Sequence, residues 1–170
     1  MSFEGAIREL DRLKRSGVMR DFALIGAVAA TVYIEPLFTE DADAVVLVDS
    51  DAEYLEVFRR VGEAAQAMRG MHYIFDGVPV QLLPTTTMPL YRDALDGART
   101  TRIGNMRIKV ATPEHLVVMS LVAFRPKDKV RIPLLLAASD DATLDTLLVR
   151  FDDGQGTLAK RLRSLRPGGV

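Results

Sequence analysis

A short apolar run that stops at a glycine constrains the fold of this chain more than any other feature. Residues 22–25 read Phe-Ala-Leu-Ile, Gly26 ends the run, and an Ala-rich segment at 27–33 continues to Pro36. Glycine adopts backbone angles that other residues avoid and proline ends helices, so this pattern predicts a strand, a tight turn and a helix. The strongest predicted strand follows at 42–48. The chain therefore combines strands and helices from its start.

The remaining sequence predicts further strands and then mainly helices. Asp76-Gly77 is a hairpin signal between strands at 73–75 and 78–83, since both central residues of a type I′ turn need positive φ, and one more strand is predicted at 106–110. Helices are predicted at 3–17, 53–68 with Asp51 as N-cap, 88–98, 112–125 with Thr112 as N-cap, 130–138, 142–151 and 158–165.

These elements predict an α+β fold, in which a mixed sheet of about four or five strands is flanked by helices. Because the strands come first and the helices afterwards, we expect an α/β core at 1–111. A helical C-terminal segment at 112–170 is expected to pack on this core.

The composition excludes several classes of site. The 170 residues include no Cys, so any metal must be held by oxygen or imidazole, and a reducing cytoplasm is the expected compartment. Lys and Arg number 22 against 23 Asp and Glu, and a net charge of −1 is no strong nucleic-acid signature. No stretch reads as a signal peptide or a membrane span, so no membrane partner is expected.

Gly26 and the pair Asp41 and Asp43 form the candidate site. A helix that begins at Gly26 and Ala27 presents N–H groups and a dipole that can hold phosphate. Residues two apart lie on one strand face, roughly 6.5 Å apart, so both carboxylates can point into one groove. Carboxylate oxygens suit Mg²⁺, and two such ions about 3.5–4 Å apart assist in-line displacement of pyrophosphate. The alternative is that Gly26 only turns the chain and that both Asp side chains are solvated.

Other polar residues are weaker candidates. His72 and His115 lack the spacing of a zinc-binding pair, and Asp76 is explained by its turn. The hydroxyls at 85–87 have no nearby base and are expected to satisfy their own loop. A basic run either contacts phosphate of a nucleotide or RNA or forms a solvated helix start; it comprises Arg125, Lys127, Lys129 and Arg131.

Five segments carry a resemblance to one known family. They are 22–33 around Gly26, 38–46 with Thr39, Asp41 and Asp43, 77–83, 108–116 and 124–128. In this order they resemble the glycine signature, the Thr-x-Asp-x-Asp strand, the third-carboxylate strand, the strand–helix connection and the following helix turn of nucleotidyltransferase-fold proteins. The similarity is to the small bacterial kind, which includes toxin–antitoxin-associated members, and it covers most of the chain.

This resemblance implies a mixed sheet with flanking helices and, in active members, a two-metal site. Asp41 and Asp43 would be the catalytic Mg²⁺ ligands, while Gly26, Ala27 and Thr39 would contact a nucleoside triphosphate.

The chain also departs from the family pattern. Ala27 stands where Gly or Ser is usual, Leu37 where Arg is usual, and Gln81 at the place of the third carboxylate. A neutral amide can ligate through its oxygen but cannot act as a general base. Ser120 and Arg131 occupy positions where the family often has Lys and Asp.

Two functions follow from the match and the departures. One is Mg²⁺-dependent transfer of a nucleotidyl group from a nucleoside triphosphate to an acceptor, which is a protein, an RNA or a small molecule. The other is a catalytically degenerate protein of this fold that binds a ligand or regulates a partner.

Overall fold

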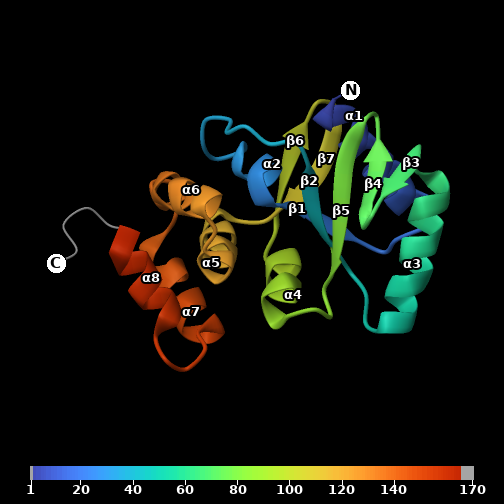
Figure 1. Ribbon diagram of the computed structural model, residues 1–170. Coiled ribbons are helices and arrows are strands. Elements are labelled where there is room, and N and C mark those ends of the chain that lie inside the picture. Colours follow the sequence, from blue (N-terminus) through green and yellow to red (C-terminus); the bar gives the residue numbers. More distant parts are fainter. Residues whose placement is uncertain (1, 166–170) are drawn as a thin grey trace.

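The computed structural model describes residues 2–165, which form a seven-stranded sheet with helices on both faces (Figure 1). The strands are β1 (Phe22–Ile25), β2 (Ala42–Val46), β3 (Ala67–Arg69), β4 (His72–Phe75), β5 (Val78–Pro84), β6 (Arg99–Ile103) and β7 (Met106–Val110). The helices are α1 (Phe3–Arg15), α2 (Gly26–Ala30), α3 (Asp51–Ala64), α4 (Pro89–Asp96), α5 (Pro113–Ala123), α6 (Pro126–Leu136), α7 (Asp141–Phe151) and α8 (Thr157–Leu165).

The sheet is mixed, and the strand that carries Asp43 lies at its centre. The strand order is β3-β4-β5-β2-β1-β7-β6. β2 pairs in parallel with β5, β1 pairs in parallel with β7, and the other neighbours are antiparallel. The predicted α+β fold with a mixed sheet and flanking helices is confirmed.

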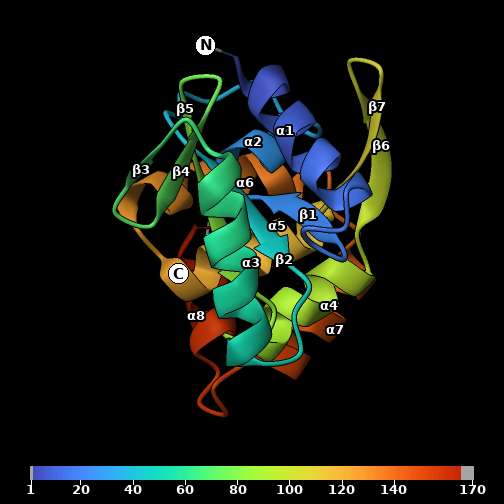
Figure 2. The same cartoon turned by 90° about the vertical axis from the view of Figure 1, so that its right-hand side faces the viewer.

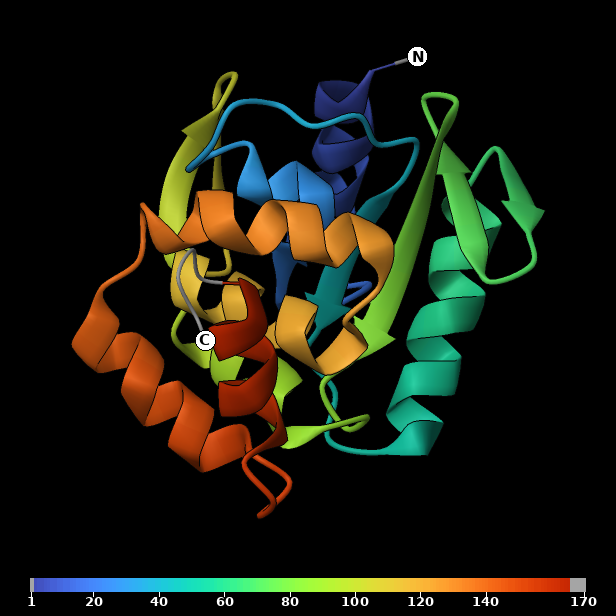
Figure 3. The same cartoon turned by 60° about the vertical axis from the view of Figure 1, so that its left-hand side comes forward.

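The helices form two layers around the sheet. α1 and α3 cover one face, as Figure 2 shows, while α2, α5 and α6 cover the other face in Figure 3. α7 and α8 lie against α5 on the side away from the sheet. Because α5 is surrounded in this way, its side chains are buried all round rather than along one stripe.

Local signals predict most of the boundaries near the site. In the hairpin between β4 and β5, Asp76 and Gly77 have φ of 45° and 74°, as a type I′ turn requires. Thr112 is the N-cap of α5, and its side chain accepts the N–H of His115. The division into segments 1–111 and 112–170 stays a prediction, and 166–170 lie outside the described residues.

Four expectations about helices are wrong in detail. α6 begins at Pro126 rather than at 130, because a proline is accommodated in the first turn of a helix. α2 has only five residues, because the chain leaves the helix after Ala30, well before Pro36. α3 ends at Ala64, and Met68 belongs to β3, which pairs with β4. The N-cap of α3 is Ser50, whose side chain accepts the N–H of Glu53, rather than Asp51. Within residues 2–165 no helix is long and apolar enough to cross a membrane.

Candidate functional site

Strand pairing brings the glycine turn and the second carboxylate into contact. β1 and β2 are antiparallel with Ile25 opposite Asp43, so Gly26 follows directly beside that side chain. Gly26 has φ of 68°, and a Cβ at this position would lie 2.7 Å from Oδ2 of Asp43. Glycine is therefore required here both for its backbone angle and for the close approach of a carboxylate. Residues 17 positions apart form one site.

Asp41 lies immediately before β2, and its carboxylate is oriented by a neighbour. The hydroxyl of Thr39 donates a hydrogen bond of 3.0 Å to Oδ1 of Asp41. Burial and the negative charge of Asp41 raise the pKa of Asp43. The two carboxylates are thus close enough to interact electrostatically.

Gln81 lies beside Asp43 on β5, the neighbour of β2 on the side away from β1. β2 and β5 are parallel, with Asp43 paired with Gln81 and Ala42 with Val80. Two adjacent residues of parallel strands carry their side chains on the same sheet face, so the amide of Gln81 lies next to the carboxylate of Asp43. The site therefore contains two carboxylates and one amide, and the described residues include no group of three or more His, Asp or Glu side chains that could hold a metal ion.

Two cavities adjoin this carboxylate pair. The first, which we call the glycine cavity, has a volume of about 320 Å³ and is lined by residues that include Gly26, Asp43, Gln81, Ser120 and Arg125. The second, which we call the basic cavity, has a volume of about 700 Å³ and is lined by residues that include Asp41, Arg69, His72 and Lys127. Arg131 lines both cavities. Asp43 thus faces one cavity and Asp41 the other.

The members of the basic run after α5 differ in their surroundings. Some line one of the two cavities, and another contacts an aromatic ring. Arg125 donates from Nε to Oδ2 of Asp128 at 2.8 Å, and this bond raises the pKa of Arg125. Lys127 is exposed at the basic cavity, whereas the ammonium of Lys129 lies 4.5 Å above the Phe124 ring. The sequence left open whether this run contacts phosphate or is solvated, and only tertiary packing distinguishes its members.

The remaining predicted residues are placed differently. Ala27 is half-buried in α2 and lines neither cavity, while Thr39 lines the basic cavity. Because α2 has five residues, few aligned peptide groups are available to hold phosphate at its start. His72 lines the basic cavity, which its sequence spacing did not indicate. His115 is buried, and its Nε2 lies 2.9 Å from Oδ2 of Asp93.

Comparison with known proteins identifies the fold. No family profile and no curated protein sequence matches the chain. An antigenic nucleotidyltransferase-like protein from Paracoccidioides brasiliensis has a similar structure, with a TM-score of 0.62 at 17% identity over 94% of this chain and 91% of that chain. The structure of ANT(2")-Ia in complex with adenylyl-2"-tobramycin gives 0.56 at 10% identity, over 95% and 97%. The chain therefore has a nucleotidyltransferase-like fold.

We expect Gly26→Ala to destabilise the protein more than Gly17→Ala. Both glycines have positive φ, so alanine at either position costs about 1 kcal/mol of backbone strain. A Cβ at Gly17 meets no atom within 4 Å, whereas at Gly26 it meets the Asp43 carboxylate. Urea unfolding of both variants measures the difference in the free energy of unfolding. Equal losses would show that the contact between Gly26 and Asp43 is unimportant.

We expect Asp43→Asn to stabilise the metal-free protein at neutral pH. The raised pKa of Asp43 means that the folded state binds its proton more tightly than the unfolded chain. This contribution of Asp43 to stability is present below the ordinary carboxyl pKa and is lost as the pH rises through the raised pKa. The ionised group therefore opposes folding at pH 7. Denaturation in EDTA over a pH series shows whether Asp43→Asn raises or lowers the free energy of unfolding.

Asp49→Asn is the matched control for this pH series. Its hydrogen bond with Arg20 lowers the pKa of Asp49, so removal of this charge should destabilise the fold at pH 7. A loss of stability in Asp43→Asn would contradict the assignment of Asp43 as a desolvated carboxylate whose charge opposes folding.

Proposed function

We propose that this chain binds a nucleoside triphosphate with Mg²⁺ beside Gly26 and transfers its nucleotidyl group to an acceptor. The observation that carries the proposal is the contact of the Gly26 turn with Asp43, with Asp41 two residues before it. The glycine cavity beside this turn has room for phosphate, and adjacent carboxylates supply oxygen ligands for the ion. The nucleotidyltransferase-like fold supports this proposal.

The residues present fit one Mg²⁺ that arrives with a triphosphate. Mg²⁺ in proteins is usually held by one or two carboxylates together with substrate phosphates and water. Asp41 and Asp43 would provide the carboxylates, and the amide oxygen of Gln81 is a further neutral ligand beside Asp43. When bound, the ion neutralises negative charge on the phosphates. Thr39 fixes the orientation of Asp41 through its hydrogen bond.

Cationic and hydroxyl groups of the glycine cavity are suited to the phosphates. Arg125 lines this cavity, and its guanidinium is oriented by Asp128, which is 1% exposed. An arginine that is held in this way loses little side-chain entropy when it binds a phosphate oxygen. The buried hydroxyl of Ser120 lies in the same cavity and is a further donor. These groups bind and orient the triphosphate in the proposed complex.

A second candidate function is nucleotide binding without transfer. The observation that favours it is Gln81 in register with Asp43, where a carboxylate would complete the metal site. An amide neither accepts the proton of an attacking hydroxyl nor balances the charge of a second divalent ion. In this case the same cavity would bind the nucleotide and the chain would act on a partner.

We expect binding of nucleoside triphosphate to require Mg²⁺ and both carboxylates. Titration calorimetry with each of the four ribonucleoside triphosphates, with Mg²⁺ or with EDTA, measures this requirement. Asp41→Asn and Asp43→Asn should each weaken Mg²⁺-dependent binding at least about tenfold, because even the loss of an outer-shell contact typically costs that much. Asp49→Asn, which removes an exposed carboxylate outside both cavities, should bind normally.

Labelled transfer distinguishes the two candidate functions. Triphosphate labelled at the α-phosphate is incubated with the protein and with protein, RNA and small-molecule fractions. Label on any fraction, lost in Asp43→Asn, supports transfer. Metal-independent binding without label transfer would overturn the first function and support the second.

We expect Gln81→Glu to strengthen the metal site. A carboxylate at this position lies beside Asp43 and adds a third anionic ligand, so Mg²⁺ should bind more tightly than in the natural chain. A base there typically adds a factor of about 10²–10⁴ to a proton-transfer step, so labelled transfer should also rise. Gln81→Ala controls for the loss of the amide. An unchanged Mg²⁺ affinity in Gln81→Glu would show that residue 81 lies outside the metal site.

A further inference from the structure

Arg131 is a buried cation with one unused hydrogen-bond donor. The residue is 7% exposed, and its Nε has no hydrogen-bond partner among residues 2–165. Nη1 lies 3.9 Å from Oδ1 of Asp128, whose oxygens instead accept hydrogen bonds from Arg125. A buried guanidinium N–H without a hydrogen-bond partner is costly, so a group that accepts this hydrogen would be bound strongly.

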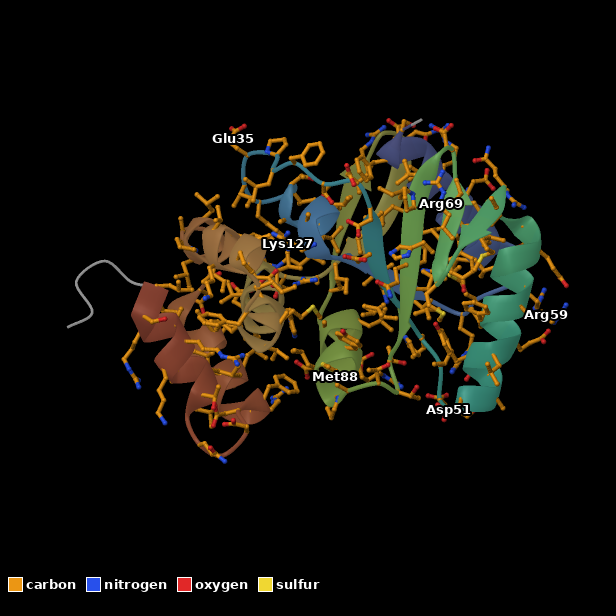
Figure 4. The ribbon with its side chains drawn as sticks, in the orientation of Figure 1. Glu35, Asp51, Arg59, Arg69, Met88 and Lys127 are labelled. Atoms are coloured by element: carbon orange, nitrogen blue, oxygen red, sulfur yellow. The ribbon has the colours of Figure 1, made fainter. Side chains whose placement is uncertain are left out.

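The walls of the basic cavity favour an anion with an apolar part. Arg131 is joined there by Lys127, Arg69 and His72, against the two carboxylates of Glu40 and Asp41. Figure 4 shows Lys127 on α6, and Arg69 on β3 across the cavity from it. The apolar walls include two side chains with little cover, Phe38 at 90% exposed and Val130 at 62%. The exposed ring of Phe38 offers a flat surface on which a ring of a ligand can stack.

We propose that the basic cavity binds the acceptor of the transfer reaction, and that this acceptor carries a phosphate or carboxylate group next to an apolar ring. This inference rests on the proposed function, which assigns the glycine cavity to the triphosphate. Asp43 faces the glycine cavity and Asp41 the basic cavity, so the carboxylate pair lies between the two ligands. Arg131 lines both cavities and holds the oxyanion of the acceptor beside the reacting phosphate.

The reaction balances with the two ligands placed in this way. The hydroxyl oxygen of the acceptor forms a bond to the α-phosphorus, and the bond from that phosphorus to pyrophosphate breaks. Pyrophosphate leaves with the electron pair, and the hydroxyl proton passes to water. An acceptor in the basic cavity approaches from the side of Asp41, opposite the glycine cavity that holds the leaving pyrophosphate.

Three simple probes test the charge preference of the cavity. Phenyl phosphate, benzoate and benzylamine share a ring and differ in charge, and their binding is measured by calorimetry in EDTA at low ionic strength. We expect phenyl phosphate to bind and benzylamine not to bind. Binding of benzoate as well shows that any oxyanion is accepted, whereas binding of phenyl phosphate alone restricts the acceptor to phosphorylated compounds. Equal binding of benzylamine and phenyl phosphate would overturn the proposal.

Variants locate the bound probe. Arg131→Met keeps an unbranched, though shorter, side chain and removes its charge, and Lys127→Ala removes an exposed cation that lines the basic cavity. Each should weaken phenyl phosphate binding about tenfold or more, as expected for hydrogen bonds to a charged group. The control is Arg59→Ala, because Arg59 is exposed on α3, on the opposite face of the sheet from Lys127 (Figure 4). Unchanged binding in both Arg131→Met and Lys127→Ala would refute the site.

Competition separates this inference from the proposed function. Phenyl phosphate should still bind when Mg²⁺ and ATP saturate the protein, because the two ligands occupy different cavities. Displacement by ATP would show that the anion binds at the triphosphate site, and would overturn the inference while leaving the proposed function intact. Conversely, a chain that binds phenyl phosphate through Arg131 but fails to bind any triphosphate retains the anion site and loses the proposed function.

Discussion

The pairing of β1 with β2 is the constraint on which the rest of the site depends. Its register places Ile25 opposite Asp43, and this requires a residue without a side chain at position 26. Because β2 also pairs with β5, Asp43 has a fixed neighbour on each side, the Gly26 turn and Gln81. Backbone hydrogen bonds of a central strand therefore set the chemical surroundings of a single carboxylate, and a shift of one residue in this register would turn Asp43 to the other face of the sheet.

Much of the fold could be predicted from local signals, and the errors at the two sheet edges have a common physical cause. The Asp76-Gly77 turn and the Thr112 N-cap depend on residues adjacent in sequence, so they are correctly predicted. Met68 continues a helical spacing, yet the chain there pairs with β4 as an edge strand whose residues are exposed. An exposed edge strand needs no apolar alternation, so its sequence carries no strand period. The sequence does not predict the edge strand β6 (Arg99–Ile103) for the same reason, since most of its residues are exposed.

The glycine and the two carboxylates of the candidate site could be predicted from the sequence, whereas its positively charged side chains could not. Gly26, Asp41 and Asp43 are named by sequence because a glycine turn and a strand entrance are local features. The importance of Arg131 is not local: a basic run has the same pattern whether it is solvated or buried. Arg131 is buried in the middle of α6, where its side chain lines a cavity together with Gly26 and Asp43, and only the tertiary structure shows this. His72 enters the basic cavity for a similar reason, through the pairing of β4 with β5.

The charges around Asp43 affect phosphate and divalent ions differently. Burial and the charge of Asp41 make the ionised form of Asp43 unfavourable, and the positive charges of Lys127 and Arg125 oppose this effect. An amide at position 81 adds no negative charge, and a guanidinium at position 131 adds a positive one close to both carboxylates. Such a site attracts divalent ions less than three carboxylates would, and attracts phosphate more. In the proposed complex, a metal ion would then be held mainly together with phosphate, so the affinity for the metal would depend on the bound nucleotide.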